Sequence, residues 1–350
     1  MFPVFFRGVH GNATKSLFFL GHQVKLHIIT NLADRTKLGR GLPVVDFDAY
    51  RLGVDDVADE KLDVLAKELK TAFTEVGFVY LKNNGISQQE VDAIMDISEN
   101  FFLLPDKEKM PFRRGNYSEV NHGWVCAGSE RLNPQRASDL KEAFNITTLN
   151  PNVKWPSNDV VPDFREKLLS FFQRCKDLSL RVLRVLELSL GVAPDVFLGK
   201  HSMVGEEQNG TTLRLLHYPP VRPESVKEEQ VRCGEHSDFG TITMVFQGPG
   251  GGLQVLDRTG NYITAPTIPG TVLINIGDLM QRWTADVFVS AIHRVLLPPP
   301  GDMSTRQSIA FFLHPNDDAL ITCTDGSDKY PPVNALDYLN ERFTHSYGKK

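Results

Sequence analysis

The stretch Gly234-Glu235-His236-Ser237-Asp238-Phe239-Gly240 places a histidine and an aspartate two residues apart. In a β-strand, residues i and i+2 point to the same face of the sheet. His236 and Asp238 can therefore reach one metal ion, while Ser237 points away from it. The triplet is a weak signal by itself, because the chain holds 10 histidines and 43 acidic residues. Residues that follow the triplet in the chain make the prediction of a metal site specific.

A second histidine and an arginine–serine pair follow in order. His293 lies 55 residues after Asp238, and Arg306-Gln307-Ser308 begins 13 residues after His293. Two histidines and one carboxylate form the facial triad that binds Fe(II) and keeps other metal positions open. The guanidinium of Arg306 and the hydroxyl of Ser308, again at i and i+2, suit a carboxylate. The ordered set predicts an Fe(II) site beside a carboxylate-binding site.

Several segments share their residue patterns with one enzyme family. They include Leu-Arg-Leu-Leu-His-Tyr-Pro-Pro over residues 213–220 and Ser-Ala-Ile-His-Arg-Val over residues 290–295, with further matches at 42–47, 77–86, 236–243, 251–255 and 272–278. With them the chain resembles the isopenicillin N synthase-like family of Fe(II)/2-oxoglutarate-dependent dioxygenases over about residues 42–347. Leu216 and Ala285 stand where many relatives have asparagine. The motifs therefore identify the family and not a substrate.

The resemblance implies a fold and a reaction. The expected fold class is α+β with a mainly β core, a double-stranded β-helix (jelly roll) with flanking helices. The implied enzyme is an oxidoreductase, a dioxygenase that uses Fe(II), 2-oxoglutarate and O2. It would hydroxylate a small organic molecule, or oxidise a C–H bond of it in a related way. In the same reaction 2-oxoglutarate would lose CO2 and become succinate.

The resemblance also assigns roles to individual residues. Iron would be held by the triad, so that the metal ligands and catalytic residues are His236, Asp238 and His293. The far carboxylate of 2-oxoglutarate would bind Arg306 and Ser308, with Tyr218 as a third donor. Contacts to the substrate, placed by analogy with relatives, would come from Arg131, Lys141, Phe144, Asn145 and Phe312.

Three other interpretations stay open at this point. Some relatives with the same iron site and Arg-x-Ser pair bind no 2-oxoglutarate, and there the pair grips a substrate carboxylate. A non-catalytic binding protein on the same barrel is a more distant alternative, although all three metal ligands are present. A zinc hydrolase also uses two histidines and a carboxylate. That interpretation leaves Arg306 and Ser308 without a role.

Composition excludes several classes of partner. The chain has 350 residues, of which 41% are hydrophobic and 23% charged, as in an ordinary globular protein. Its net charge of −5 gives no reason to expect nucleic acid, which would favour a basic patch. No apolar run is long enough to cross a bilayer, and the four cysteines lie far apart, as free thiols do. We therefore expect a monomer with a small-molecule substrate and no nucleic-acid or membrane partner.

The first forty residues differ from the rest in charge. They hold six Lys/Arg against one acidic residue, whereas the remainder holds 32 basic and 42 acidic residues. A basic, acid-poor N-terminus with apolar clusters resembles a mitochondrial transit peptide. A poorly ordered extension of a cytosolic protein is the other interpretation. We expect a basic extension over residues 1–41 on a cytoplasmic protein, with mitochondrial import left open.

Two regions are expected beyond this extension. Residues 42–160 would form the N-terminal region of the dioxygenase fold. Residues 161–347 would hold a long helix, the jelly roll and a C-terminal helix. The hydrophobic spacing predicts helices over 59–74 and 163–190. The C-terminal helix, residues 335–347, is expected to pack outside the barrel.

Smaller signals mark a helix start and a loop. Ser87 and Glu90 form a predicted capping box for a helix that follows them. Residues 113–136 interrupt the regular pattern with Gly, Asn, Ser and Pro, as functional lids often do, although poorly packed surface is the alternative. His122 in this stretch and His314 after the Arg306 strand are further candidates for the pocket.

Overall fold

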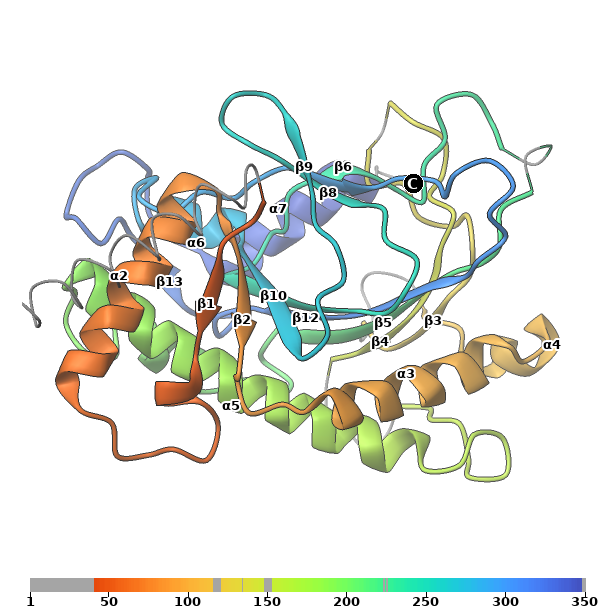
Figure 1. The fold of residues 1–350 in the computed structure, drawn as a ribbon, viewed down its shortest axis with the longest axis horizontal. Helices are drawn as coiled ribbons and strands as arrows, with labels where there is room; N and C mark the ends of the chain where they lie inside the picture. Colours follow the sequence, from red (N-terminus) through yellow and green to blue (C-terminus); the bar gives the residue numbers. More distant parts are fainter. Residues whose placement is uncertain are drawn as a thin grey trace, which may run out of the picture. The chain divides into compact units, whose positions relative to one another are not determined.

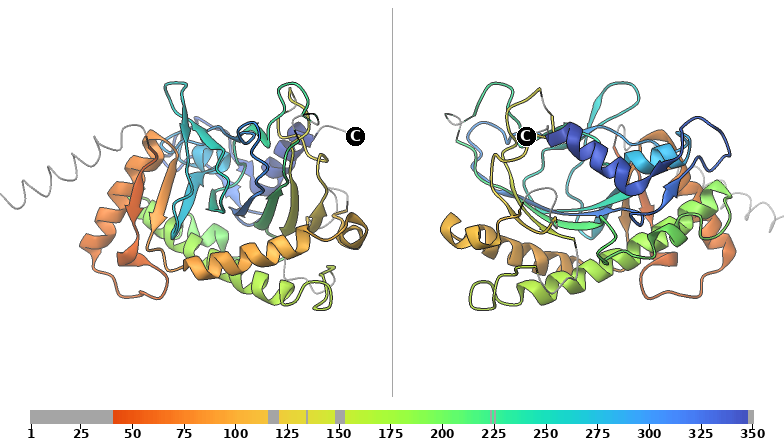
Figure 2. Two further views of the ribbon diagram at one scale, coloured as in Figure 1. Left: turned by 45° about the vertical axis from the view of Figure 1, so that its right-hand side comes forward. Right: turned by 180° about the vertical axis from the view of Figure 1, so that it is seen from behind.

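The computed structural model describes residues 41–115, 121–133, 135–147, 153–222, 224 and 226–347. The residues from Leu42 onward form one compact unit. The predicted basic extension lies outside the described residues, apart from Gly41. Figures 1 and 2 show the compact unit as two β-sheets with helices packed against the larger one.

The larger sheet has eight strands, and all its neighbouring pairs are antiparallel except the parallel pair β1–β2. In spatial order the strands are β1 (Val44–Asp46), β2 (Phe78–Lys82), β10 (Thr271–Ile276), β7 (Ile242–Gln247), β12 (Arg306–Leu313), β5 (Thr212–Tyr218), β4 (Glu142–Ile146) and β3 (Gly123–Val125). The smaller sheet has four antiparallel strands: β6 (Cys233–His236), β11 (His293–Val295), β8 (Leu253–Leu256) and β9 (Tyr262–Thr264). This is the predicted jelly roll.

Helices cover one face of the larger sheet. They are α2 (Asp59–Glu75), α3 (Gln88–Phe102), the short α4 (Asp106–Lys109) and α5 (Phe164–Leu190). The capping box of α3 forms as predicted: Glu90 N–H donates to Ser87 Oγ (3.2 Å), and Ser87 N–H donates to the Glu90 carboxylate (2.8 Å). Gly191 ends α5 with a left-handed φ of 67°, which suits glycine.

Side chains along the central strands alternate between two faces of the larger sheet. One face packs against the helices, and the other faces the smaller sheet. Ile309, Phe311 and Leu313 of β12 join the helix-side core, where the rings of Phe172 and Phe311 meet edge to face at 5.1 Å. The alternate residues of the same strand, from Arg306 to Phe312, face the space between the two sheets. The candidate site lies in that space.

Smaller elements complete the unit. They are α6 (Asp278–Trp283), α7 (Ala335–Tyr347), the two-stranded sheet of β13 (Leu320–Ile321) and β14 (Val333–Asn334), and the 3-10 turns Asp48–Tyr50, Met110–Phe112 and Leu198–His201. The helix α7, expected to pack outside the barrel, also contributes to a cavity. The views from front and back place α7 on the opposite side of the larger sheet from α5, and Leu339 and Phe343 of α7 line a cavity that reaches the metal ligands.

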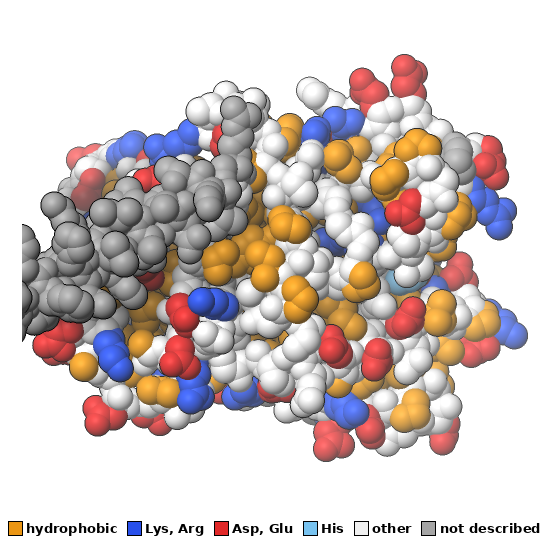
Figure 3. Space-filling model, in the orientation of Figure 1, with side chains coloured by type: hydrophobic (Ala, Val, Ile, Leu, Met, Phe, Trp, Pro, Cys, Tyr) orange, Lys and Arg blue, Asp and Glu red, His pale blue; other side chains and the backbone are white. Residues whose placement is uncertain are grey.

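Surface charge and helix composition complete the description of the fold. On the face drawn in Figure 3, acidic and basic side chains are interspersed among the described residues. No helix within the described ranges is long and apolar enough to cross a membrane.

Candidate active site

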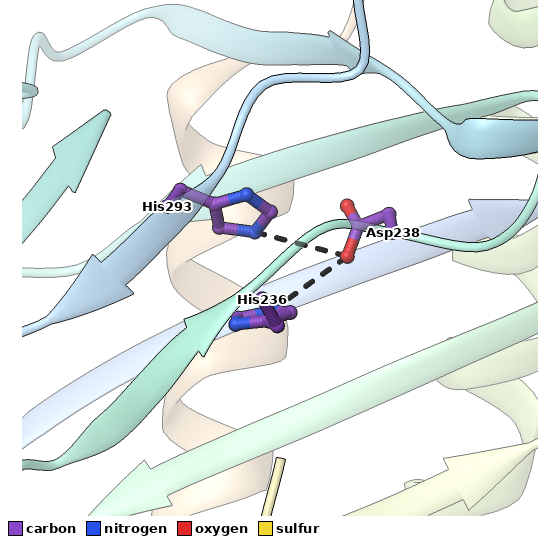
Figure 4. Close-up of side chains that lie close together, drawn as sticks. All are labelled: His236, Asp238 and His293. Atoms are coloured by element: carbon purple, nitrogen blue, oxygen red, sulfur yellow. Dashed lines mark ion pairs between the residues drawn. The ribbon is translucent and has the colours of Figure 1, made fainter. Parts of the chain in front are cut away.

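The three predicted metal ligands converge at one end of the smaller sheet. His236 ends β6, His293 begins β11, and the two residues are direct partners in the antiparallel pair. Asp238 follows β6 and presents Oδ1 at 3.8 Å from His236 Nε2 and 3.7 Å from His293 Nε2. Figure 4 shows both rings turned toward this carboxylate. The separations are too long for hydrogen bonds and leave room for an ion between the three atoms.

Backbone carbonyls fix which ring nitrogen of each histidine faces the ion. His236 Nδ1–H donates to the Gly234 carbonyl (2.8 Å), and His293 Nδ1–H donates to the Ala291 carbonyl (3.2 Å). Because a carbonyl can only accept, each Nδ1 must carry the proton and each Nε2 keeps its lone pair. Burial and the neighbouring His236 lower the pKa of His293 to about 4, so this ring is neutral at pH 7. Both histidines thus present the form that binds a metal.

The carboxylate of Asp238 is held from its other oxygen. Asn275 of β10 donates from Nδ2 to Asp238 Oδ2 at 2.8 Å, which leaves Oδ1 for the ion. Burial alone would raise the pKa of Asp238, but the neighbouring imidazoles of His293 and His236 and the bond from Asn275 lower it below its ordinary value of 3.8. Two imidazoles that present Nε2 and one carboxylate fit Fe(II) and leave further metal positions open.

A first cavity of about 80 Å³ joins these ligands to Arg306, and we call it the Arg306 cavity. Arg306 is buried, and its Nε, Nη1 and Nη2 donate to the Gly251 carbonyl (2.8 Å), Ser308 Oγ (3.2 Å) and Gln247 Oε1 (3.2 Å). All three acceptors are neutral. A buried guanidinium held by neutral groups favours a ligand that brings a negative charge, as the far carboxylate of 2-oxoglutarate does.

Tyr218 completes this end of the cavity. It is the direct partner of Arg306 in the β5–β12 pair, and the guanidinium lies 4.8 Å from the centre of its ring. Burial raises the pKa of Tyr218, so its hydroxyl stays protonated and can donate. Leu216, two residues earlier, lines the same cavity and gives it an apolar wall where many relatives have an amide.

The glycine-rich turn between β7 and β8 provides a hydrogen-bond acceptor for Arg306. Gly250 has a φ of +103°, and a Cβ placed on it would lie 3.2 Å from the Cβ of Arg306 and 3.0 Å from the Thr305 carbonyl. Only glycine allows this backbone to approach so closely. The approach brings the Gly251 carbonyl to Arg306 Nε.

A second cavity of about 90 Å³ meets the first at the metal ligands, and we call it the Asn145 cavity. The two cavities share Leu132, Arg214, His236, Asp238 and Phe312. The walls of the second one combine amides and a histidine with apolar side chains: Asn121, Asn145, His314, Phe239, Phe312, Leu339 and Phe343. Burial lowers the pKa of His314 to about 4, so its ring is neutral.

The predicted substrate contacts divide between these cavities and other places. Asn145 and Phe312 line the Asn145 cavity, and Lys141 lines the Arg306 cavity. Arg131 is exposed and lines neither cavity. Phe144 is fully buried on the other face of β4, with its ring 5.0 Å from that of Phe101. Since neighbouring residues of a strand face opposite sides, Phe144 and Asn145 cannot share a pocket, and Phe144 serves the core.

A buried cluster of charges lies beside the two cavities. Glu130 pairs with Arg214 and lies 3.6 Å from Lys141, which also pairs with Asp139. These pairs tie the loop before β4 to β5. The described part of the predicted lid thus contributes Glu130 to this cluster and Leu132 to both cavities. His122 instead packs edge to face against Trp155, outside both cavities.

Sequence reasoning missed several residues that the structure brings to the site. Arg214 had a signal, because it lies four residues before Tyr218 on the same face of β5. Asn275 had none beyond its place in a family segment. Phe239 follows Asp238 directly, whereas Asn121, Leu339 and Phe343 come from distant loop and helix positions that no periodicity joins to the triad.

Comparisons with known proteins identify the class of protein. Residues 42–163 match the model of the non-haem dioxygenase N-terminal domain, described as from morphine synthesis, and residues 209–315 match the 2OG-Fe(II) oxygenase superfamily. The chain is 31% identical to the 2-oxoglutarate-dependent dioxygenase htyE of Aspergillus rugulosus, over 88% of this chain and 99% of the relative. The chain therefore belongs to the 2OG-Fe(II) oxygenase superfamily and is a 2-oxoglutarate-dependent dioxygenase.

Solved structures agree with this class. A full-length Neurospora crassa protein crystallised with alpha-KG and thymine is 33% identical, with a TM-score of 0.77, over 87% of this chain and 97% of that one. The protein JOX2, crystallised with 2OG, Fe and JA, is 25% identical with a TM-score of 0.69, over 86% and 84% of the two chains. The predicted use of Fe(II) and 2-oxoglutarate is confirmed, and the interpretations as a zinc hydrolase or as a binding protein lose their support.

Proposed function

We propose that His236, Asp238 and His293 hold the iron and that Arg306, Ser308 and Tyr218 bind the far carboxylate of 2-oxoglutarate. One observation carries this proposal. The three converging metal ligands and a buried arginine held only by neutral acceptors line the same cavity of about 80 Å³. A dicarboxylic keto acid such as 2-oxoglutarate has one end for the metal and a far carboxylate for Arg306.

The chain's own residues would bind, orient and shield the reactants. The iron supplies, when bound, the activation of O2 that is coupled to loss of CO2 from 2-oxoglutarate. Ser308 and Tyr218 donate to the carboxylate beside Arg306, which fixes the co-substrate along the cavity. Apolar side chains such as Leu216 and Val295 exclude water around it. Asn275 keeps the Asp238 carboxylate in one orientation.

The Asn145 cavity is the proposed place of the substrate, because it includes His236 and Asp238 among its walls but not Arg306. Asn145 is buried, and its Oδ1 has no hydrogen-bond partner in the described structure. A substrate with an N–H or O–H donor and a compact apolar body would satisfy this oxygen and the walls of Phe312 and Leu339. Thymine, which the Neurospora crassa relative binds, has such groups and is the first compound to test.

We further propose that the enzyme acts as a monomer in the cytoplasm, without nucleic acid or membrane as a partner. Support comes from the net charge of −5, which gives no reason to expect a nucleic-acid partner. The interspersed surface charges in Figure 3 also favour this proposal.

The test is succinate and CO2 formation from 2-oxoglutarate by the Fe(II)-loaded protein, with thymine and then a metabolite library. We expect iron-dependent succinate formation, stimulated by a substrate whose product is heavier by one oxygen atom or lighter by two hydrogens. The Asp238→Ala variant is the control without a metal site. An oxidised product that forms in the absence of 2-oxoglutarate would favour the alternative in which Arg306 and Ser308 grip a substrate carboxylate.

A further inference from the structure

The C-terminal helix reaches the reverse side of the metal-ligand segment. Ser237 lies between His236 and Asp238, and its hydroxyl donates to Asp278 Oδ2 at 3.0 Å. The same oxygen of Asp278 accepts from Nη2 of Arg342, on α7, at 2.6 Å. Arg342 Nη2 also lies 3.4 Å from Ser237 Oγ. The guanidinium of Arg342 therefore contacts both Ser237 and Asp278, and Ser237 stands between two metal ligands in the sequence.

The residue after Asp238 meets the same arginine. The guanidinium of Arg342 lies 4.8 Å from the centre of the Phe239 ring, a distance at which a cation is attracted to the ring face. Phe239 in turn packs edge to face against Phe343 of α7, with 5.8 Å between ring centres. Both neighbours of Asp238 in the chain are therefore held by α7.

Asp278 links this contact to the backbone of the ligand itself. It begins α6, and its N–H donates to the Asp238 carbonyl at 2.7 Å. A shift of the Asp278 side chain would therefore be passed to the backbone that carries the Asp238 carboxylate. Hydrogen bonds around metal ligands usually fix their orientation, and their loss weakens metal binding by about 10- to 100-fold.

We propose that Arg342 is a positioning residue for the iron site, acting through Ser237, Asp278 and Phe239 on the segment that carries His236 and Asp238. The inference rests on the proposed assignment of these two residues as iron ligands. It also gives α7 a double role, because Leu339 and Phe343 on either side of Arg342 line the Asn145 cavity. The same helix thus lines the proposed substrate cavity and contacts Ser237 and Phe239, the residues next to the metal ligands.

The chain offers a closely matched control in Arg181 of α5. Its Nη2 pairs with Asp55 at 2.5 Å, and its guanidinium lies 4.7 Å from the centre of the Tyr50 ring. Arg181 therefore has the same kind of ion pair and the same kind of ring contact as Arg342. Neither of its partners lines the two cavities. Arg181→Gln reports what the loss of such contacts does to the fold alone.

The experiment compares Arg342→Gln, Arg342→Lys and Arg181→Gln with the unmodified full chain. Anaerobic titration with Co(II), without 2-oxoglutarate, gives the metal affinity and the visible absorption spectrum of the bound ion, neither of which requires turnover. We expect Arg342→Gln to weaken Co(II) binding about 10-fold or more and to change the spectrum. Arg342→Lys should recover part of the affinity, because lysine keeps the charge but loses the planar fork. Arg181→Gln should leave affinity and spectrum unchanged.

Equal Co(II) affinity and spectra in Arg342→Gln and Arg181→Gln would overturn the proposal. If Arg342→Gln does not fold, Arg342→Lys and Arg181→Lys carry the same comparison, with weaker Co(II) binding expected only in the first. The His293→Ala variant distinguishes failure of the proposal for Arg342 from failure of the metal-site assignment. If that variant binds Co(II) as tightly as the unmodified chain, the triad assignment falls and the role of Arg342 falls with it.

Discussion

The Arg306 cavity and the Asn145 cavity meet at the same metal ligands but are built differently. The first is lined mainly by strands, with Tyr218 directly opposite Arg306 and His236 directly opposite His293. The second takes walls from β4, from the loop before β3 and from α7. Strand pairing thus places the residues of the proposed co-substrate site. Loops and a terminal helix contribute to the cavity that we propose for the substrate.

The largest effect should come from the metal ligands, because loss of the ion would disable the reaction that both cavities serve. His293→Ala removes one of three metal bonds and should lower iron-dependent succinate formation by more than about 100-fold, beyond what loss of an outer hydrogen bond does. Iron content and turnover of the purified variant measure this. The fold should persist, since His293 lies at the end of β11. Stoichiometric iron in this variant would contradict the assignment.

Arg306 should affect the first cavity alone. Arg306→Gln removes the charge that faces the co-substrate carboxylate, and losing one partner of a buried charge pair costs about 2–5 kcal/mol. We expect the KM for 2-oxoglutarate to rise by at least about 30-fold while Co(II) affinity stays close to that of the unmodified chain. Arg306→Lys should also be impaired, because an ammonium lacks the fork geometry. A rise in substrate KM without a change for 2-oxoglutarate would reverse the roles of the two cavities.

Glu130 tests the charged cluster beside the two cavities. Burial alone would raise its pKa, but the charges of Arg214, Lys141 and Arg114 lower it from 4.5 to about 2. Because the folded-state pKa is the lower one, this carboxylate stabilises the protein above about pH 4.5, and the contribution disappears as the pH falls toward about 2. Glu130→Gln should therefore lower the free energy of unfolding by about 3 kcal/mol at pH 7.

Urea unfolding at pH 7, 5 and 3 measures this difference, with the exposed Glu60→Gln as the control. The gap between Glu130→Gln and the unmodified chain should shrink as the pH falls. A gap that stays constant down to pH 3 would mean that Glu130 does not carry its charge in this cluster.

Asn145 should give the smallest effect, confined to the second cavity. Its unpartnered Oδ1 is proposed to accept one hydrogen bond from the substrate, which is worth about 0.5–1.5 kcal/mol. Asn145→Ala should raise the KM of the first compound that stimulates succinate formation by about 2- to 10-fold, with the KM for 2-oxoglutarate unchanged. An equal rise for both would mean that Asn145 supports the barrel and not the substrate.

The same contrast explains what the sequence could predict. Arg306 and Ser308 lie within β12, where the two-residue period is enough to place both side chains on one face. His236 ends β6 and Asp238 lies just beyond the strand, so the two-residue spacing identified the ligand pair although only the histidine belongs to the strand. Helix signals were equally local, and the capping box of Ser87 and Glu90 formed as predicted. Local patterns cannot state which distant elements close a cavity. Arg131 and Phe144 were placed at the substrate by analogy with relatives, and neither lines either of the two cavities, whereas Phe343 was not expected there.

The α7 helix shows this limit most clearly. A C-terminal helix was expected over residues 335–347, and the structure has α7 over the same residues. The sequence alone could not say which surface the apolar side chains meet. Leu339 and Phe343 reach the substrate cavity because α7 crosses the barrel on the side away from α5. That path is set by tertiary packing and leaves no local signal.

The most direct test of the central claim is a crystal structure of the protein grown anaerobically with Mn(II) and 2-oxoglutarate. The account predicts one ion bound by His236 Nε2, Asp238 Oδ1 and His293 Nε2, with the far carboxylate of 2-oxoglutarate on Arg306 and the Asn145 cavity free of co-substrate. A co-substrate carboxylate in the Asn145 cavity, or one that makes no contact with Arg306, would contradict it.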